Sequence, residues 1–274
     1  MDEICHENDR ESKNKKGGIL MATLSYHEQK NIENTKKLRE LQKELPYFCT
    51  DFFRGIEAST SVRTRIAYAH DLKIFFQFLK TANPRTFDNP AHTLTPGDLE
   101  KLTVSDLEEY IDYLKCHPSD TCEDVVNTER GLMRKVSSLR SFYSYFFRNE
   151  LIEKNPAALV RMPKLHEKEI IRLEIDEVAK LLDEVEEGDK LTEKQKLYHE
   201  RTKVRDLAMM SLLLGTGIRV SECVGLNIND IDLDTCGARV YRKGGKESVI
   251  YFSDEVRDVL EDYLDEREMI DAVP

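Results

Sequence analysis

Apolar residues recur at helical spacing through much of the first half of the chain. Residues 62–80 and 130–149 place them three to four positions apart, which predicts helices that each bury one face. Thr103 and Ser105 are both suited to cap another such helix, because a hydroxyl oxygen can accept the free N–H groups of a first turn. The opposite side of the helix at 130–149 carries basic and hydroxyl residues: Arg134, Ser138, Ser141, Tyr145 and Arg148. The three apolar stripes consist of Tyr68, Leu72, Phe75, Phe76 and Leu79; Leu107, Tyr110, Ile111 and Leu114; and Leu132, Val136, Leu139, Tyr143 and Phe146.

The helical pattern breaks at residues 155–170, which hold two prolines and keep no period. Proline disfavours helical geometry in the residue before it, so we expect Asn155-Pro156 to end the preceding helix and the segment to link two domains. Farther along, residues 186–200 predict a charged loop or a frayed extension. Helices are predicted at residues 175–185, 205–214 and 220–226, the second of them closed by Gly215-Thr216-Gly217.

The period changes from helical to alternating near residue 238. Residues 238–242 and 247–252 predict two strands, and Lys243-Gly244-Gly245-Lys246 between them suits a hairpin turn because glycine accepts positive φ. Ser253 can cap a last, acidic helix that runs to about Met269, with Tyr263 on its apolar side. The pattern therefore predicts a mainly α fold with a small β hairpin or sheet. Its expected parts are a weakly ordered or disordered tail at 1–34, a helical domain at 35–158, a linker at 159–170 and an α+β domain at 171–274.

The net charge of −11 argues at first sight against a nucleic-acid partner, but the charge is unevenly spread. Residues 174–193 and 253–271 each carry nine acidic residues against two basic ones, so the rest of the chain sums to about +3. Residues 54–85 and 130–154 each hold six basic residues and two acidic ones. A bipolar protein of this kind can present a cationic face to phosphates, although helices with mixed, solvated faces would give similar counts.

Composition narrows the possible classes further. No run of about 18 apolar residues is present, so we expect no membrane-spanning helix. The six cysteines are scattered without a Cys-x-x-Cys pair, which argues against structural zinc and is typical of reduced thiols in the cytoplasm.

The segment from Gly215 to Glu222 holds the first candidate site. Its two glycines release the chain from one helix and let it enter another, which puts Arg219 at or near a helix start, where anions are attracted. A guanidinium adds a planar fork that suits two phosphate oxygens, and Glu222 lies one helical turn away, where it can hold the arginine in place. The alternative is an ordinary surface Arg–Glu pair, worth under about 1 kcal/mol.

Lys243, at the tip of the expected hairpin, is the second candidate. A lysine beside two glycines can reach toward a leaving oxygen, and an ammonium is a credible proton donor to an alkoxide. Lysines are also common at the ends of exposed strands, where they prevent edge-to-edge pairing. Lys243 alone therefore does not distinguish a catalytic proton donor from a lysine that only prevents edge-to-edge pairing.

Taken together, these segments resemble the Xer-like tyrosine recombinases and phage integrases. LLLGTGIRVSECVGLNINDIDLD, followed by RVYRKGGKESVIYF, is similar to the opening of that family's catalytic domain. TRIAYAHDLKIFFQFL resembles the first helix of its core-binding domain, and RKVSSLRSFYSYFFRNELIEKNPAALVRMPK resembles the last helix and the linker. The resemblance spans about residues 45–265. It implies a helical, SAM-like core-binding domain at 35–158 and an incomplete α+β catalytic domain at 171–274.

The resemblance implies that double-stranded DNA is the partner and that a tyrosine cuts one strand, which leaves a 3′-phosphotyrosyl link. Arg219 would be the first catalytic arginine and Glu222 would orient it. Lys243 would be the general acid for the departing 5′-hydroxyl, and Lys246 is less favoured because it falls later on the hairpin. No metal or cofactor is implied, because the phosphotyrosine keeps the energy of the broken bond. The expected DNA contacts are Arg63, Lys73, Arg134, Arg140, Arg148 and Lys246.

The sequence departs from the family pattern near its end. The family continues with a His-x-x-Arg pair, a further His or Trp and the nucleophilic tyrosine, whereas here no histidine follows His199 and Tyr263 is expected in a core. We therefore expect a C-terminally truncated recombinase that binds DNA, is inactive in cleavage and is monomeric, although its intact relatives assemble as tetramers. Two alternatives are a non-catalytic DNA-binding module that occupies recombination sites and a helical protein–protein adaptor.

Overall fold

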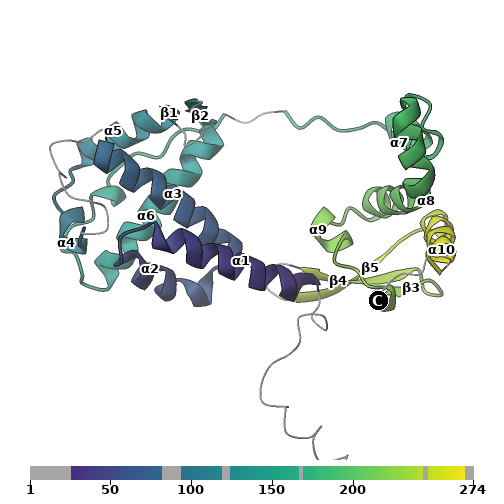
Figure 1. Ribbon diagram of the computed structural model, residues 1–274, viewed down its shortest axis with the longest axis horizontal. Coiled ribbons are helices and arrows are strands. Elements are labelled where there is room, and N and C mark those ends of the chain that lie inside the picture. The colour runs from purple at the N-terminus through teal and green to yellow at the C-terminus, as the bar shows by residue number, and fades with distance from the viewer. Residues whose placement is uncertain (1–25, 82–93, 119–123, 167–168, 243–245, 269–274) are drawn as a thin grey trace, which may run out of the picture. The chain divides into compact units, whose positions relative to one another are not determined.

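The computed structural model describes residues 26–81, 94–118, 124–166, 169–242 and 246–268 (Figure 1). The chain divides into two compact units, Met1–Lys168 and Glu169–Pro274. The described residues form a mainly helical fold with two small antiparallel sheets, as the pattern of the sequence predicts. None of the described helices is both long and apolar enough to cross a lipid bilayer.

The first unit is built around two long helices, α3 and α6, and α1 lies alongside α3 (Figure 1). Helix α1 begins at Tyr26, so regular structure starts earlier than the boundary at residue 35 that we predicted. The two-stranded ribbon of β1 and β2 has no counterpart in the sequence prediction. The helices and strands of this unit are α1 (Tyr26–Lys43), α2 (Cys49–Gly55), α3 (Val62–Thr81), α4 (Pro96–Leu99), α5 (Val104–Lys115), β1 (Cys116–Pro118), β2 (Asp124–Val126) and α6 (Glu129–Arg148), with 3-10 turns at Glu57–Ser59 and Pro156–Ala158.

The core of the first unit is rich in aromatic rings. Phe142 is fully buried, and its ring centroid lies 5.1 Å from that of Phe52 and 4.9 Å from that of Phe146, both in edge-to-face geometry. The buried hydroxyl of Tyr143 donates a hydrogen bond to the carbonyl oxygen of Leu99 at 3.2 Å. The predicted stripes of α3, α5 and α6 all contribute to this core, which confirms them.

Helix α6 ends at Arg148, well before the proline that was expected to stop it. Glu150 takes a positive φ of 58°, and the backbone N–H of Leu151 donates to the carbonyl oxygen of Phe146 at 2.9 Å. This is the Schellman arrangement, in which a left-handed residue lets the chain cap the last turn of its own helix. The prediction that Pro156 ends the helix was therefore wrong.

The second unit packs helices against a three-stranded antiparallel sheet with the order β3-β4-β5 (Figure 1). The strands predicted at 238–242 and 247–252 correspond to β4 and β5, whereas β3 was missed. Residues 243–245 of the expected hairpin turn lie outside the described part of the chain. The helices and strands are α7 (Ile175–Glu187), α8 (Glu193–Thr216), α9 (Val220–Cys223), β3 (Ile231–Asp232), β4 (Gly237–Arg242), β5 (Lys246–Tyr251) and α10 (Asp254–Glu268), with a 3-10 turn at Ile228–Asp230.

Helix α8 is much longer than predicted. It begins at Glu193, within the segment that we expected to be a charged loop or a frayed extension. The backbone N–H of Thr192 donates to Oε1 of Gln195 at 2.9 Å, so the chain enters the helix through a capping box. Helix α7 corresponds to the helix predicted at 175–185, but α8 covers its apolar side chains only in part and none is fully buried.

Candidate functional site

The end of helix α8 places Arg219. Gly217 has a φ of 66°, a left-handed conformation that glycine adopts readily, and the chain turns there. Gly215 is needed for a different reason, because a Cβ at this position would lie 2.9 Å from Cγ2 of Val256 on α10. Arg219 follows as the residue that caps α9, which confirms its expected place at a helix start. Because α9 is only one turn long, its dipole adds little to anion binding.

Glu222 holds Arg219 at two points. Its side chain is 6% exposed, and its two oxygens accept the backbone N–H of Arg219 at 3.0 Å and the guanidinium Nη1 at 2.6 Å. The backbone N–H of Arg219 lowers the pKa of Glu222; burial opposes this, and the charges of Arg219 and Arg242 lower it further. The Arg219 side chain is 71% exposed, so the rest of its guanidinium faces solvent. The structure thus brings these two predicted site residues together as an oriented cation.

The predicted general acid, Lys243, lies outside the described residues. Its neighbour Arg242 ends β4 and acts electrostatically on Glu222, so the described end of this strand is close to the Arg219 site. Lys246 begins β5 directly opposite Arg242 and is exposed. Arg242 was not among the predicted site residues, although it stands next to one of them.

The first unit holds a second oriented arginine. Nη1 of Arg134 lies 2.5 Å from Oδ2 of Asp71, and the Asp71 side chain is only 3% exposed. Burial raises the pKa of Asp71, while the charge and hydrogen bond of Arg134 partly offset this rise. Ser138 was expected on the exposed face, but it is fully buried and lies beside Asp71. The Arg134 side chain remains 48% exposed, so it can still reach a phosphate.

Around His70 the structure gathers basic side chains from three helices, which we call the cationic cluster: Lys37 of α1, His70 and Lys73 of α3, and Arg134 of α6. Burial lowers the pKa of His70, and the charges of Lys37, Lys73 and Arg134 lower it further, against an opposing effect of Glu44. Lys73 is also ion-paired with Glu44 at 2.8 Å. Lys37 and His70 were not among the predicted DNA contacts, although His70 and Lys73 stand three residues apart on the polar side of one predicted helix.

The remaining predicted contacts of the first unit differ in their surroundings. Arg63 is exposed at the start of α3, and Arg148 is exposed at the end of α6, where its Nε donates to its own helix. Arg140 instead donates three hydrogen bonds, at 3.1, 3.0 and 2.8 Å, to the carbonyl oxygens of residues 157, 158 and 160. It secures the segment after α6, so we leave it out of the DNA contacts.

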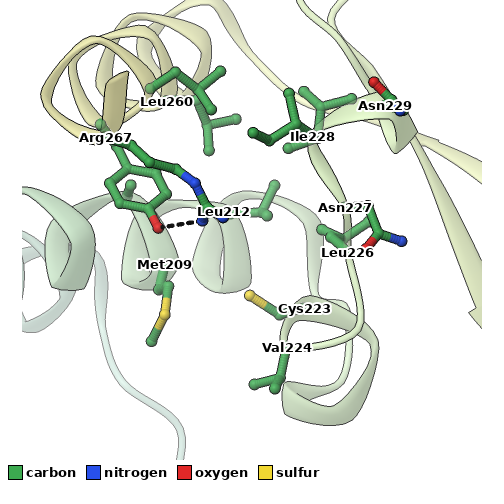
Figure 2. A pocket seen from close by; sticks show the side chains of 14 residues that line it. Met209, Leu212, Cys223, Val224, Leu226, Asn227, Ile228, Asn229, Leu260 and Arg267 are labelled. Atoms are coloured by element: carbon green, nitrogen blue, oxygen red, sulfur yellow. Dashed lines mark hydrogen bonds between the residues drawn. The ribbon is translucent and has the colours of Figure 1, made fainter. Parts of the chain in front are cut away.

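The second unit also contains an apolar pocket of about 560 Å³, which Figure 2 shows. Met209, Leu212, Leu226 and Leu260 contribute to its lining, whereas Arg219 and Glu222 do not. The hydroxyl of Tyr263 accepts a hydrogen bond from Arg267 at 3.2 Å (Figure 2). Tyr263 packs against the core of this unit, as predicted.

Comparison with known proteins fits this architecture. Residues 171–273 match the phage integrase family. The tyrosine recombinase XerC of Caldanaerobacter subterraneus subsp. tengcongensis is 32% identical over 253 residues, which cover 90% of this chain and 64% of that protein. The tyrosine recombinase XerS of Streptococcus uberis is 30% identical over 263 residues, 85% of this chain and 71% of that protein. The chain belongs to the Xer-like tyrosine recombinases.

This tyrosine recombinase chain spans less than two thirds of the length of the Caldanaerobacter relative. A solved structure of the Tn1549 transposon integrase in complex with a circular intermediate DNA has a TM-score of 0.51 and 17% identity, covering 82% of this chain and 66% of that one. At this identity the likeness concerns the fold alone, and it agrees with the mainly helical tyrosine recombinase fold described above.

Proposed function

We propose that this chain is the DNA-binding part of a site-specific recombinase, and that both of its units contact duplex DNA. The observation that carries the proposal is the oriented guanidinium of Arg219, which the buried carboxylate of Glu222 holds at the end of a glycine turn. Such a preorganised cation neutralises charge that builds up on a phosphate during strand cleavage, which is commonly the largest catalytic contribution. Membership of the tyrosine recombinase family supports the same role.

The chemistry assigns a different task to each residue. Arg219 binds the scissile phosphate, Glu222 keeps its guanidinium in place, and Lys243 donates a proton to the departing 5′-oxygen, with Lys246 as the less favoured donor. The attacking tyrosine is not Tyr263, because that hydroxyl is bonded to Arg267 and its ring packs on the core. These 274 residues thus bind DNA, and breaking and rejoining strands through a 3′-phosphotyrosyl link requires a tyrosine other than Tyr263.

In the first unit the cationic cluster, Arg63 and Arg148 contact backbone phosphates. These contacts are independent of base sequence and add to affinity through the release of counterions. We further propose a cytoplasmic protein that is monomeric in isolation, whereas intact family members assemble as a tetramer on DNA. A non-catalytic module that occupies recombination sites is the second candidate, and it rests on the same cations without the cleavage step.

Binding is tested with a fluorescent 30-base-pair duplex titrated at several salt concentrations. We expect binding at low salt, with log K falling linearly against log salt and a slope of about −0.9 for each phosphate contacted. Arg63→Gln should lower the magnitude of that slope by about 0.9. Arg54→Gln changes another exposed arginine, which lies on α2 and has an ion pair of its own, and it should not lower the slope.

Cleavage is tested with a nicked suicide substrate, on which a recombinase accumulates a covalent adduct that is visible in a denaturing gel. The 274-residue polypeptide should form none. A protein that binds no duplex even at low salt would instead be the helical adaptor, whereas a covalent adduct would overturn the expectation that these residues do not cleave DNA.

A further inference from the structure

The strand pair beside Arg219 carries two cations that face each other. β4 and β5 are antiparallel, and their register sets Arg242 opposite Lys246, Val240 opposite Ser248 and Ala238 opposite Ile250. Directly opposed residues in such a pair have side chains on the same face, within about 5.5 Å of each other at Cβ. Two like charges in this position destabilise the sheet unless something neutralises them.

The face on which Arg242 lies is the inner one. Side chains alternate along a strand, so Ala238, Val240 and Arg242 share one face of β4. Ala238 and Val240 are each 1% exposed and belong to the core formed with α8. Helix α9 packs against β4, so the cation at the end of this face comes close to the residues that α9 carries.

The single negative charge of Glu222 cannot neutralise Arg219, Arg242 and Lys246 together. Both of its oxygens are already occupied by Arg219, yet the charge of Arg242 contributes to the lowered pKa of this carboxyl. Within the described part of the chain, no ion pair or hydrogen bond of the Arg242 or Lys246 side chain is found. Arg219, Arg242 and Lys246 against Glu222 leave a net charge of +2 at this place.

This local positive charge contrasts with the negative charge of the unit around it. Residues 169–274 contain 26 acidic and 15 basic residues, so the second unit carries the whole net charge of −11. An excess of positive charge within so acidic a unit is typical of a site that binds an anion.

We propose that Arg242 is a further phosphate-binding residue, which sets a second guanidinium beside Arg219 so that both grip the DNA backbone. The proposal rests on the proposed function, because the phosphate belongs to bound DNA. Two planar forks can hold the oxygens of one phosphate or of adjacent phosphates, which single lysines do less specifically. The phosphate also removes the repulsion between Arg242 and Lys246.

The test compares Arg242→Gln with Arg239→Gln. Both arginines lie on β4 and are exposed, and both changes remove one positive charge, but Arg239 is on the opposite face of the strand. In the duplex titration we expect Arg242→Gln to weaken binding roughly 3- to 10-fold near 0.1 M salt and to reduce the salt slope by about 0.9. Arg239→Gln should leave the slope unchanged. Equal effects of the two changes would overturn the proposal, because they would show a general loss of charge.

A second measurement separates this proposal from the proposed function. Pyrophosphate should raise the melting temperature of the wild-type protein, and Arg242→Gln should lose most of that rise while Arg239→Gln keeps it. If wild-type protein binds no duplex but shows this pattern, the DNA-binding function fails and the anion site stands. If Arg242→Gln keeps the full rise and the full affinity, the site is refuted. Without ligand, Arg242→Gln should not lower the melting temperature, because it relieves a repulsion.

Discussion

The pair of Arg134 and Asp71 allows the most complete prediction. Replacing Arg134 by alanine leaves the Asp71 carboxylate, 3% exposed, without its partner cation. Removing one partner of a fully buried ion pair costs about 3–5 kcal/mol, and an exposed pair is worth roughly 0.2–1 kcal/mol. Arg134 is 48% exposed, which puts this pair between the two cases, so we expect a loss of about 2 kcal/mol at pH 8. For a unit of this size the melting temperature falls by roughly 4 °C per kcal/mol, about 8 °C in total.

The loss depends on pH in a direction that can be worked out. Burial raises the pKa of Asp71 in the folded protein above its usual value of about 3.9, and removal of Arg134 raises it further. Such a group favours the folded state below its unfolded pKa and loses that contribution as the pH rises through the folded pKa. The difference between Arg134→Ala and wild type should therefore be small near pH 4 and grow toward neutral pH.

The assay is urea unfolding followed by circular dichroism, because the chain contains no tryptophan, with hydrogen exchange of α3 and α6 to report on the first unit. The matched background is Asp71→Asn, in which the buried group carries no charge. There Arg134→Ala should cost under about 1 kcal/mol at every pH. Equal losses at pH 5 and pH 8, or an undiminished loss in the Asp71→Asn background, would refute the reasoning.

Three further predictions follow from the two sites. Gly217→Ala should destabilise the second unit by about 1 kcal/mol through its backbone alone, since a Cβ there meets nothing within 4 Å, and Gly217→Asn should cost less in the same urea titration. Glu222→Gln should cost about 1 kcal/mol at pH 7, a modest value because Arg219 is mostly in water. Because the pKa of Glu222 is lowered in the fold, this cost should begin to shrink as the pH falls through the unfolded glutamate pKa of about 4.3, and it should be lost once the pH passes the lower folded pKa. A loss that persists in strong acid would contradict the prediction. Phosphates bound at the cationic cluster should raise the lowered pKa of His70, so duplex affinity should increase from pH 7.5 to pH 5.5 by fluorescence anisotropy, and His70→Gln should flatten the profile.

Much of the fold was predictable because its signals are local. Periodic stripes marked α3, α5 and α6, and alternation marked β4 and β5. The start of α8 was predictable in principle, since Thr192 and Gln195 form a recognisable capping box. The ribbon of β1 and β2 gave no such signal, because each strand is three residues long and β2 is wholly exposed.

Other features depend on contacts that only the folded chain creates. Ser138 has a polar side chain at a position that the fold buries. It lies beside Asp71 of another helix and lowers the pKa of that carboxyl. Arg140 turns toward carbonyl groups of residues 157–160, and no local pattern shows where a long cation will turn. Arg242 shows the opposite case, because its shared face with Val240 follows from strand alternation once the register is known.

The uneven charge of the second unit has a consequence for how it meets a duplex. A polyanion that comes near α7 or α10 is repelled by their carboxylates, whereas Arg219 and Arg242 near α9 attract it. Electrostatic repulsion thus contributes to the orientation in which the second unit binds the duplex. Added salt screens the carboxylates as well as the arginines, so it should lower both the affinity for DNA and the preference for one binding orientation.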